Sequence, residues 1–182
     1  TSFSMASQDV RYYLNGLLLE LSGSEIKGVA TDGHRLALSS HESTDNNHEM
    51  KNIIPRKAVL ELAKLLPVED LDIDLLVGPT YLGIKTENLT FSSKLIDGKY
   101  PDYEKVFPSG EPRPLLVGKE TLQSALSRAS VLSNEKYRGV RFELSKDTLR
   151  LTANNPEQES AEEVLEVDYQ GADLEVGFNI GY

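Results

Sequence analysis

The chain has 182 residues, of which 39% are apolar and 26% charged, a globular composition, and its lack of cysteine excludes disulfides and thiolate sites. The net charge of −10 is uneven, because Leu151–Tyr182 holds eight of the 29 acidic residues and none of the 19 Lys and Arg. An acidic total therefore does not exclude a basic surface elsewhere on the molecule that meets nucleic acid.

The first predicted elements are two strands joined by a tight turn. Leu17, Leu19 and Leu21 alternate with their neighbours before a turn at Ser22–Ser24, and residues 26–30 are predicted to form the returning strand.

The next predicted element is a helix that begins at Pro55, a residue favoured in the first helical position. Its apolar arc is formed by Val59, Leu62, Leu65 and Leu66. On the opposite face Lys57 and Lys64 lie within about 20° of each other, with Arg56 beside them. This basic stripe suits phosphate contacts, although an ordinary solvated helix face explains it equally well.

A second helix is predicted over Lys119–Leu132, with a buried stripe formed by Leu122, Ala125, Leu126 and Ala129. Val131 points away from this stripe, which favours an exposed contact over a core position. Two strands follow, Val140–Leu144 and Leu149–Ala153, joined by a turn at Ser145–Asp147.

An internal repeat relates the two halves of the chain at a spacing of 123 residues. Asn15–Ala30 aligns with Arg138–Ala153 without a gap and with five identities, although two unrelated hairpins with similar turns remain an alternative. The repeat places the counterpart of the second helix before Thr1, and Tyr182 opposite Val59, so we expect both ends to be truncated. The join carries four prolines, Pro101, Pro108, Pro112 and Pro114, and we place the boundary near Arg113.

Four segments resemble the bacterial sliding clamp, the beta subunit of DNA polymerase III. They are Thr31–Leu36, Ser93–Tyr103, Leu132–Val140 and Asn154–Glu159, and the resemblance extends over essentially the whole chain. It implies an α+β clamp fold, with antiparallel sheets outside, helices lining the inner face and tandem repeated domains. Residues 1–113 would be most of the middle domain, and residues 114–182 the first half of the third.

The family resemblance implies a processivity factor, a ring of two subunits that encircles duplex DNA without reading its sequence. It assigns DNA contacts to Arg56, Lys57 and Lys64, and to a loop containing Gln8, Arg11, Tyr12 and Tyr13. Tyr12 or Tyr13 could equally be a core residue at the start of a strand. Homodimer contacts are implied for Val131, Leu132, Glu157, Glu159, Glu162 and Glu163, although a solvated acidic face explains any one of the glutamates as well.

The resemblance also implies a hydrophobic groove that binds short linear motifs of polymerase subunits, the clamp loader and repair proteins. Its residues would be Leu14, Thr31, Gly33, His34, Arg35, Leu36, Pro101, Val106, Asn179 and Tyr182. Apolar walls suit Leu or Phe anchors, with Arg35 and His34 at the rim. For Leu14 and Leu36, the residues alone favour plain core packing.

Catalysis, metals and cofactors are not expected. Asp32 and His34 could suggest a dyad, but no serine or cysteine motif accompanies them. The longest apolar run, Leu17–Leu19, is far shorter than the roughly 20 residues that span a membrane, so a cytoplasmic location is expected. The alternative function is a stand-alone peptide-binding module that does not encircle DNA, and a hydrolase or transferase would need a reactive constellation that the sequence does not offer.

Overall fold

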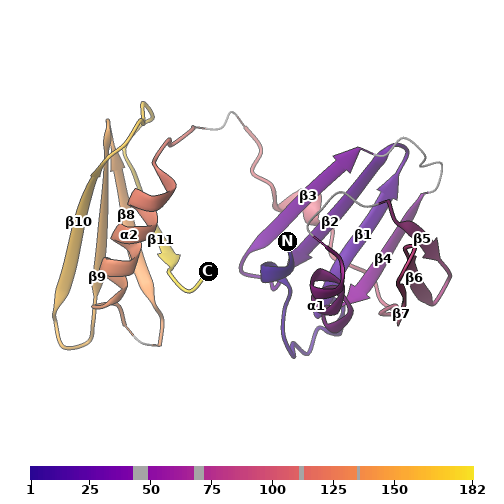
Figure 1. Ribbon diagram of the computed structural model, residues 1–182. Coiled ribbons are helices and arrows are strands. Elements are labelled where there is room, and N and C mark those ends of the chain that lie inside the picture. The colour runs from indigo at the N-terminus through magenta and orange to yellow at the C-terminus, as the bar shows by residue number, and fades with distance from the viewer. Residues whose placement is uncertain (43–48, 68–71, 111–112, 135) are drawn as a thin grey trace. The chain divides into compact units, whose positions relative to one another are not determined.

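The computed structural model describes residues 1–42, 49–67, 72–110, 113–134 and 136–182. These form two compact units, unit 1 (Thr1–Phe107) and unit 2 (Pro108–Tyr182), each with its own hydrophobic core (Figure 1). Pro112 in the proline-rich join, and Glu135 within the segment 132–140, lie outside the described residues.

The main sheet of unit 1 is antiparallel, with the strand order β3-β2-β1-β4. Its strands are β1 (Gly16–Ser22), β2 (Glu25–Thr31), β3 (Leu36–Glu42) and β4 (Met50–Pro55). The two strands and the turn predicted at the start of the chain are confirmed as β1 and β2, which pair from Leu18 with Val29 to Ser22 with Glu25.

Both faces of β1 are covered, because its leucines contribute to two separate cores. Leu18 packs with Val29 and Ile53 on one face. Leu17 and Leu19 pack on the other face, against the buried cluster that also contains the first helix. The predicted alternation is therefore correct for the strand, but it does not mark an exposed face.

The first helix, α1 (Arg56–Leu65), packs against β1 and β4. Two details of its prediction are wrong. Pro55 is extended (ψ 141°) and ends β4, so that the helix begins one residue later. Leu65 is exposed, because it occupies the last helical position and the chain becomes extended at Leu66; Ala58 and Leu62 supply the buried contacts.

A second, three-stranded sheet completes unit 1, in the order β5-β6-β7. Its strands are β5 (Asp74–Val77), β6 (Tyr81–Lys85) and β7 (Thr90–Lys94). A bridge between Ile53 and Ile96 connects the chain after β7 to β4. Three short 3-10 helices also belong to unit 1: η1 (Ser2–Ser4), η2 (Tyr12–Leu14) and η3 (Tyr103–Val106).

Unit 2 is one helix on an antiparallel sheet with the order β10-β9-β8-β11. Its elements are α2 (Lys119–Ser130), β8 (Gly139–Ser145), β9 (Thr148–Asn154), β10 (Ser160–Glu166) and β11 (Leu174–Asn179). α2 packs on β9 and β10, and the predicted stripe is confirmed by the full burial of Ala125 and Ala129. In the described part of the chain, no helix is long and apolar enough to cross a membrane.

The internal repeat is confirmed as a structural repeat. β1 and β8 begin 123 residues apart, as do β2 and β9, while the other two pairs, β3 with β10 and β4 with β11, are offset by 124. The strand order is the same in both units, with the fourth strand returning beside the first. One additional residue between the second and third strands of unit 2 accounts for the change of offset.

Candidate functional site

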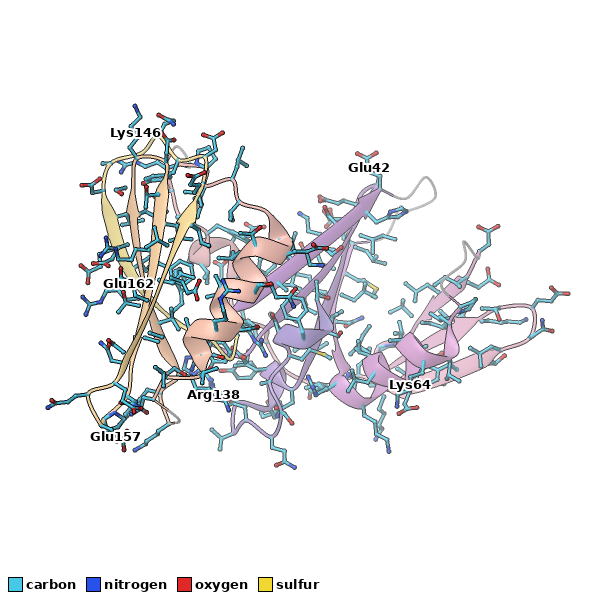
Figure 2. All side chains as sticks on the ribbon, turned by 60° about the vertical axis from the view of Figure 1, so that its left-hand side comes forward. Glu42, Lys64, Arg138, Lys146, Glu157 and Glu162 are labelled. Atoms are coloured by element: carbon cyan, nitrogen blue, oxygen red, sulfur yellow. The ribbon has the colours of Figure 1, made fainter. Side chains whose placement is uncertain are left out.

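A groove lies beside α1 in unit 1, and we call it the α1 groove. It encloses about 440 Å³ and is lined by Ala6, Ser7, Gln8, Asn15, Arg56, Lys57, Leu60, Glu61 and Lys64. Four of the residues predicted to contact DNA, Gln8, Arg56, Lys57 and Lys64, therefore lie together. Figure 2 shows Lys64 at the C-terminal end of α1. Three cationic side chains and one carboxylate give this groove a charge that favours an anionic partner.

The cations of the α1 groove differ in how they are held. Nη1 of Arg56 donates to the carbonyl oxygen of Met5 at 3.1 Å, which holds the guanidinium against the segment between η1 and η2. Lys57 is exposed, and Nζ of Lys64 lies 3.1 Å from Oε1 of Glu61. Because surface ion pairs of this kind are weak, Lys64 can exchange its carboxylate partner for a phosphate.

Arg11 lies beside the turn between β2 and β3 and does not line the α1 groove. Its Nε and Nη2 donate to the two carboxylate oxygens of Asp9 at 3.0 and 2.8 Å. Nη2 also donates to the carbonyl oxygen of Asp32 at 3.2 Å. The hydrogen bonds from Arg11 lower the pKa of Asp9 to about 2. The structure therefore groups Arg11 with the turn rather than with the lysines of α1.

The two tyrosines of η2 are placed differently. The ring of Tyr12 is exposed and makes an edge-to-face contact with Tyr13, with 5.8 Å between the ring centroids. Tyr13 is half-buried and packs against the core of unit 1, which is the alternative that the sequence left open for it. Only Tyr12 of this pair presents its ring at the surface.

The turn between β2 and β3 carries half of the predicted groove residues: Thr31, Gly33, His34, Arg35 and Leu36. Oγ1 of Thr31 donates to the carbonyl oxygen of Arg35 at 2.7 Å and accepts the N–H of Gly33 at 3.1 Å. The carboxylate of Asp32 accepts the N–H groups of His34 and Arg35 at 2.9 and 3.1 Å. Burial raises the pKa of Asp32, but these hydrogen bonds outweigh burial and leave the pKa below its ordinary value. Asp32 is thus a residue that shapes the turn.

Leu14 belongs to a core cluster of unit 1, and Leu36 packs against the same cluster. Leu14 is only 2% exposed, so it offers little surface of its own. Leu36 is partly buried and reaches the surface at the start of β3. Core packing thus accounts for Leu14, whereas Leu36 has both a buried and an accessible side.

The segment from Tyr100 to Val106 is tied to the same turn. Oη of Tyr100 accepts the N–H of Thr31 at 2.9 Å, which holds the chain at Pro101 close to the β2–β3 connection. Pro101 is exposed, and Val106 at the end of η3 is 66% exposed. Within unit 1 the structure therefore brings the turn and Pro101 together, and leaves Val106 as an exposed apolar side chain on the connected segment.

A buried carboxylate fastens this segment a second time. Glu20 on β1 is 5% exposed; its Oε2 accepts the hydroxyl of Tyr103 at 2.9 Å, and its Oε1 lies 2.9 Å from Nζ of Lys51. Burial raises the pKa of Glu20, but the hydrogen bonds from Lys51 and Tyr103 outweigh it, so that the pKa is lowered. This network could not be predicted from the sequence, because one acidic residue in an alternating strand is typical of a solvent-facing position.

Two predicted groove residues, Asn179 and Tyr182, belong to unit 2. Asn179 ends β11, where its Oδ1 accepts the N–H of Gly181 at 2.8 Å and its carbonyl oxygen accepts the N–H of Tyr182 at 3.2 Å. These bonds fold the chain into a turn beyond the sheet and leave the ring of Tyr182 exposed.

The residues predicted for a subunit interface lie on two parts of unit 2. Val131 caps α2 and is 78% exposed, which confirms that it faces away from the buried stripe, and Leu132 is half-buried. Figure 2 shows Glu157 at the connection between β9 and β10, and Glu162 on β10.

The four glutamates differ in their partners. Glu163 accepts two hydrogen bonds of 2.7 Å from Arg128, and Glu162 lies 3.3 Å from Nη1 of Arg150. Glu159 accepts the side-chain N–H of Asn155 at 2.7 Å. Glu157 is exposed at the end of the sheet. Glu163 is therefore already neutralised within unit 2.

Family models and relatives match this chain along its length. Residues 1–102 match the model of the DNA polymerase III beta subunit, central domain, and residues 104–182 match that of its C-terminal domain. The beta sliding clamp of Pseudomonas aeruginosa is 50% identical over 185 residues, which cover all of this chain and 50% of that protein.

Solved structures agree with the family models. The DNA polymerase III subunit beta from Pseudomonas aeruginosa superimposes with a TM-score of 0.96 at 49% identity, over all of this chain and 50% of that one. A sliding clamp from the same species, bound to griselimycin, gives 0.94 at 51% identity, over all of this chain and 49% of that one. The shared fold confirms the predicted α+β class, and the chain spans about half the length of these relatives.

Proposed function

The chain belongs to the family of the DNA polymerase III beta subunit, the bacterial sliding clamps, and on that premise we propose that it is part of a DNA polymerase processivity factor. The observation that carries the proposal is the repeated four-stranded sheet in two units, combined with the cationic groove along α1. Repeated units of this kind suit a ring around duplex DNA. The proposed function is to tether the polymerase to chromosomal DNA by encircling the duplex and to dock partner proteins, without catalysis, in the bacterial cytoplasm.

We assign residues 1–113 to the middle clamp domain and residues 114–182 to the first half of the third. The family models support two domains, but they meet between residues 102 and 104, before the assigned boundary. The described units divide between Phe107 and Pro108, within the proline-rich join and also before Arg113.

DNA contact is assigned to the α1 groove and the loop before η2. Arg56, Lys57 and Lys64 would meet phosphates, with Gln8 at the groove wall and Tyr12 presenting an exposed ring. Phosphate contacts carry no sequence information and release counterions, so binding would be independent of sequence and weakened by salt. Arg11 and Tyr13 have weaker support, since one is ion-paired beside the turn and the other packs on the core.

Peptide docking is assigned to the turn from Thr31 to Leu36 and to the segment bearing Pro101 and Val106. Exposed apolar groups beside cationic Arg35 suit a short motif with apolar anchors, from polymerase subunits, the clamp loader or repair proteins. Asn179 and Tyr182 in unit 2 are also assigned to peptide docking. Because a related clamp holds griselimycin, that compound serves as a probe for the groove.

Subunit pairing is assigned to Val131 and Leu132 at the end of α2, and to the glutamates on and before β10. The exposure of Val131, an apolar side chain with no core to join, supports a contact made in a homodimer. Glu157, Glu159 and Glu162 would contribute charge complementarity, which affects the rate and selectivity of association more than its strength. Glu163 has weaker support, because Arg128 already pairs with it.

The test uses the full-length subunit on nicked circular DNA and on linear DNA of the same length. A closed ring stays on the circle and slides off the free ends, so we expect retention on the circle alone after a salt wash. Equal loss from both forms, with griselimycin still bound, would favour the stand-alone peptide-binding module. Equal retention on both would contradict sliding.

A further inference from the structure

The buried carboxylate of Glu20 has no role in the functions proposed so far. Among the described residues it is the one charged side chain that is buried, at 5% exposure. Taking a carboxylate out of water is unfavourable unless charged or hydrogen-bonding partners compensate. Such a group is therefore expected to hold something in place, and its two partners indicate what it holds.

The partners of Glu20 come from different parts of unit 1. Lys51 lies on the neighbouring strand β4, and its side chain is largely exposed. Tyr103, by contrast, is 5% exposed and lies 83 residues away in the sequence, at the start of η3. The hydrogen bond to Tyr103 is thus a contact between the sheet and the segment that contains η3.

A second tyrosine hydrogen bond anchors the other end of this segment. Oη of Tyr100 accepts the N–H of Thr31 at 2.9 Å, while Oη of Tyr103 donates to Glu20 at 2.9 Å. Pro101 lies between the two anchors, and Val106 is one turn of η3 beyond the second. Both proposed groove residues are exposed, so their position depends on the two tyrosines beside them, whose rings are buried in the core of unit 1 and whose hydroxyls make these two bonds.

We propose that Glu20 and Tyr103 are positioning residues for the peptide-binding groove, through a buried hydrogen bond that holds the segment Tyr100–Val106 against β1. The inference rests on the proposed function, because it presumes that Pro101 and Val106 contact the docked motif. Neither Glu20 nor Tyr103 contacts that motif; both hold in place the segment Tyr100–Val106, which carries the residues that do. Without the hydrogen bond between Glu20 and Tyr103, the segment must become ordered when the motif docks, and the affinity for the motif is lower.

The test uses the full-length subunit and griselimycin as the probe. Tyr103→Phe removes only the hydroxyl, and we expect a roughly tenfold loss of affinity, the size set by one hydrogen bond to a charged acceptor. Glu20→Gln keeps an acceptor for Tyr103, and its affinity is expected to remain within roughly threefold of the unaltered protein. Retention on circular DNA is expected to be unchanged in both variants.

Tyr169→Phe is the matched control, because Tyr169 is also buried and its hydroxyl donates to the carbonyl oxygen of Ala172 at 2.7 Å in unit 2. It removes the hydroxyl of a buried tyrosine far from the segment Tyr100–Val106 in the sequence, and should leave griselimycin affinity unchanged. Wild-type affinity in a folded Tyr103→Phe protein, or an equal loss in the control, would overturn the positioning role. If the unaltered protein does not bind griselimycin, the proposed groove itself fails.

Discussion

The guanidinium of Arg11 lies directly against Gly33: a Cβ atom added at Gly33 would be 3.0 Å from both Nη1 and Nη2. Gly33 also has a φ of +90°, a conformation that side chains disfavour. Because Asp9 holds Arg11 through two hydrogen bonds, the guanidinium cannot move aside without losing them. The turn that bears the proposed groove thus requires glycine at this position.

Gly33→Ala is therefore expected to lower the free energy of unfolding by about 1–2 kcal/mol, as backbone strain of this kind does. Urea denaturation followed by circular dichroism measures the change. Gly177→Ala is the control, because an added Cβ atom there meets nothing within 4 Å. The control should change stability by less than about 0.5 kcal/mol. Equal effects at the two glycines would show that neither the backbone conformation of Gly33 nor its contact with Arg11 has an energetic role.

Neutralising two lysines of the α1 groove should reduce the dependence of DNA binding on salt. For Lys57→Gln combined with Lys64→Gln in the full-length subunit, the slope of log K against log salt should become less negative by roughly one unit per lysine. Fluorescence anisotropy of duplex DNA over a range of salt concentrations gives the slope. Lys146→Gln, at the β8–β9 turn in Figure 2, should leave it unchanged. An unchanged slope in the double variant would remove α1 from the DNA surface.

The lowered pKa of Glu20 predicts how stability depends on pH. A carboxyl group with a pKa below its ordinary value near 4.5 contributes stability above that value, and loses it as the pH falls through the folded-state pKa. The unaltered protein should therefore melt at a higher temperature than Glu20→Gln at pH 7. The difference should shrink as the pH is lowered below 4.5. A constant difference between pH 7 and pH 3 would mean that ionisation of Glu20 is not coupled to folding.

Val131 offers a test of subunit pairing that leaves the core intact. Val131→Asp places a charge on an exposed position, so we expect folding to be unaffected and the dimer dissociation constant of the full-length subunit to rise at least roughly tenfold. Sedimentation velocity over a dilution series measures it. Val10→Asp, at a fully exposed site in unit 1, is the control and should not change association. Dimers of normal strength would exclude Val131 from the interface.

Local patterns were sufficient to predict the two hairpins and both helices. Val140 and Leu144 are buried as their alternation indicated, and the 123-residue repeat found both copies of the sheet. Periodicity was a poorer guide to burial at the end of α1. The spacing of Leu65 places it on the apolar face, but the helix ends there, and spacing alone does not show whether another element covers that part of the face.

Contacts between distant residues escaped prediction. Glu20 in β1 has the appearance of a polar residue on an exposed strand face, and only the folded chain brings Tyr103 to it. The contact of Arg11 with the Asp32 carbonyl oxygen is likewise made between residues far apart in the sequence, and the assignment of Arg11 to DNA contact stays a prediction. In both cases the partner is set by tertiary structure, which no spacing rule encodes.

Two sheets of the same strand order in one chain also create a hazard during folding. β3 and β10 each have a neighbour on one side only among the described residues, and such edges can recruit the wrong strand before the native sheets close. Their side chains have diverged: β10 carries Glu162, Glu163 and Glu166, whereas β3 begins with Leu36 and Ala37. The greater negative charge of β10 makes it a poorer partner than β3 for a strand of the other copy, which disfavours the exchange of strands between the two sheets.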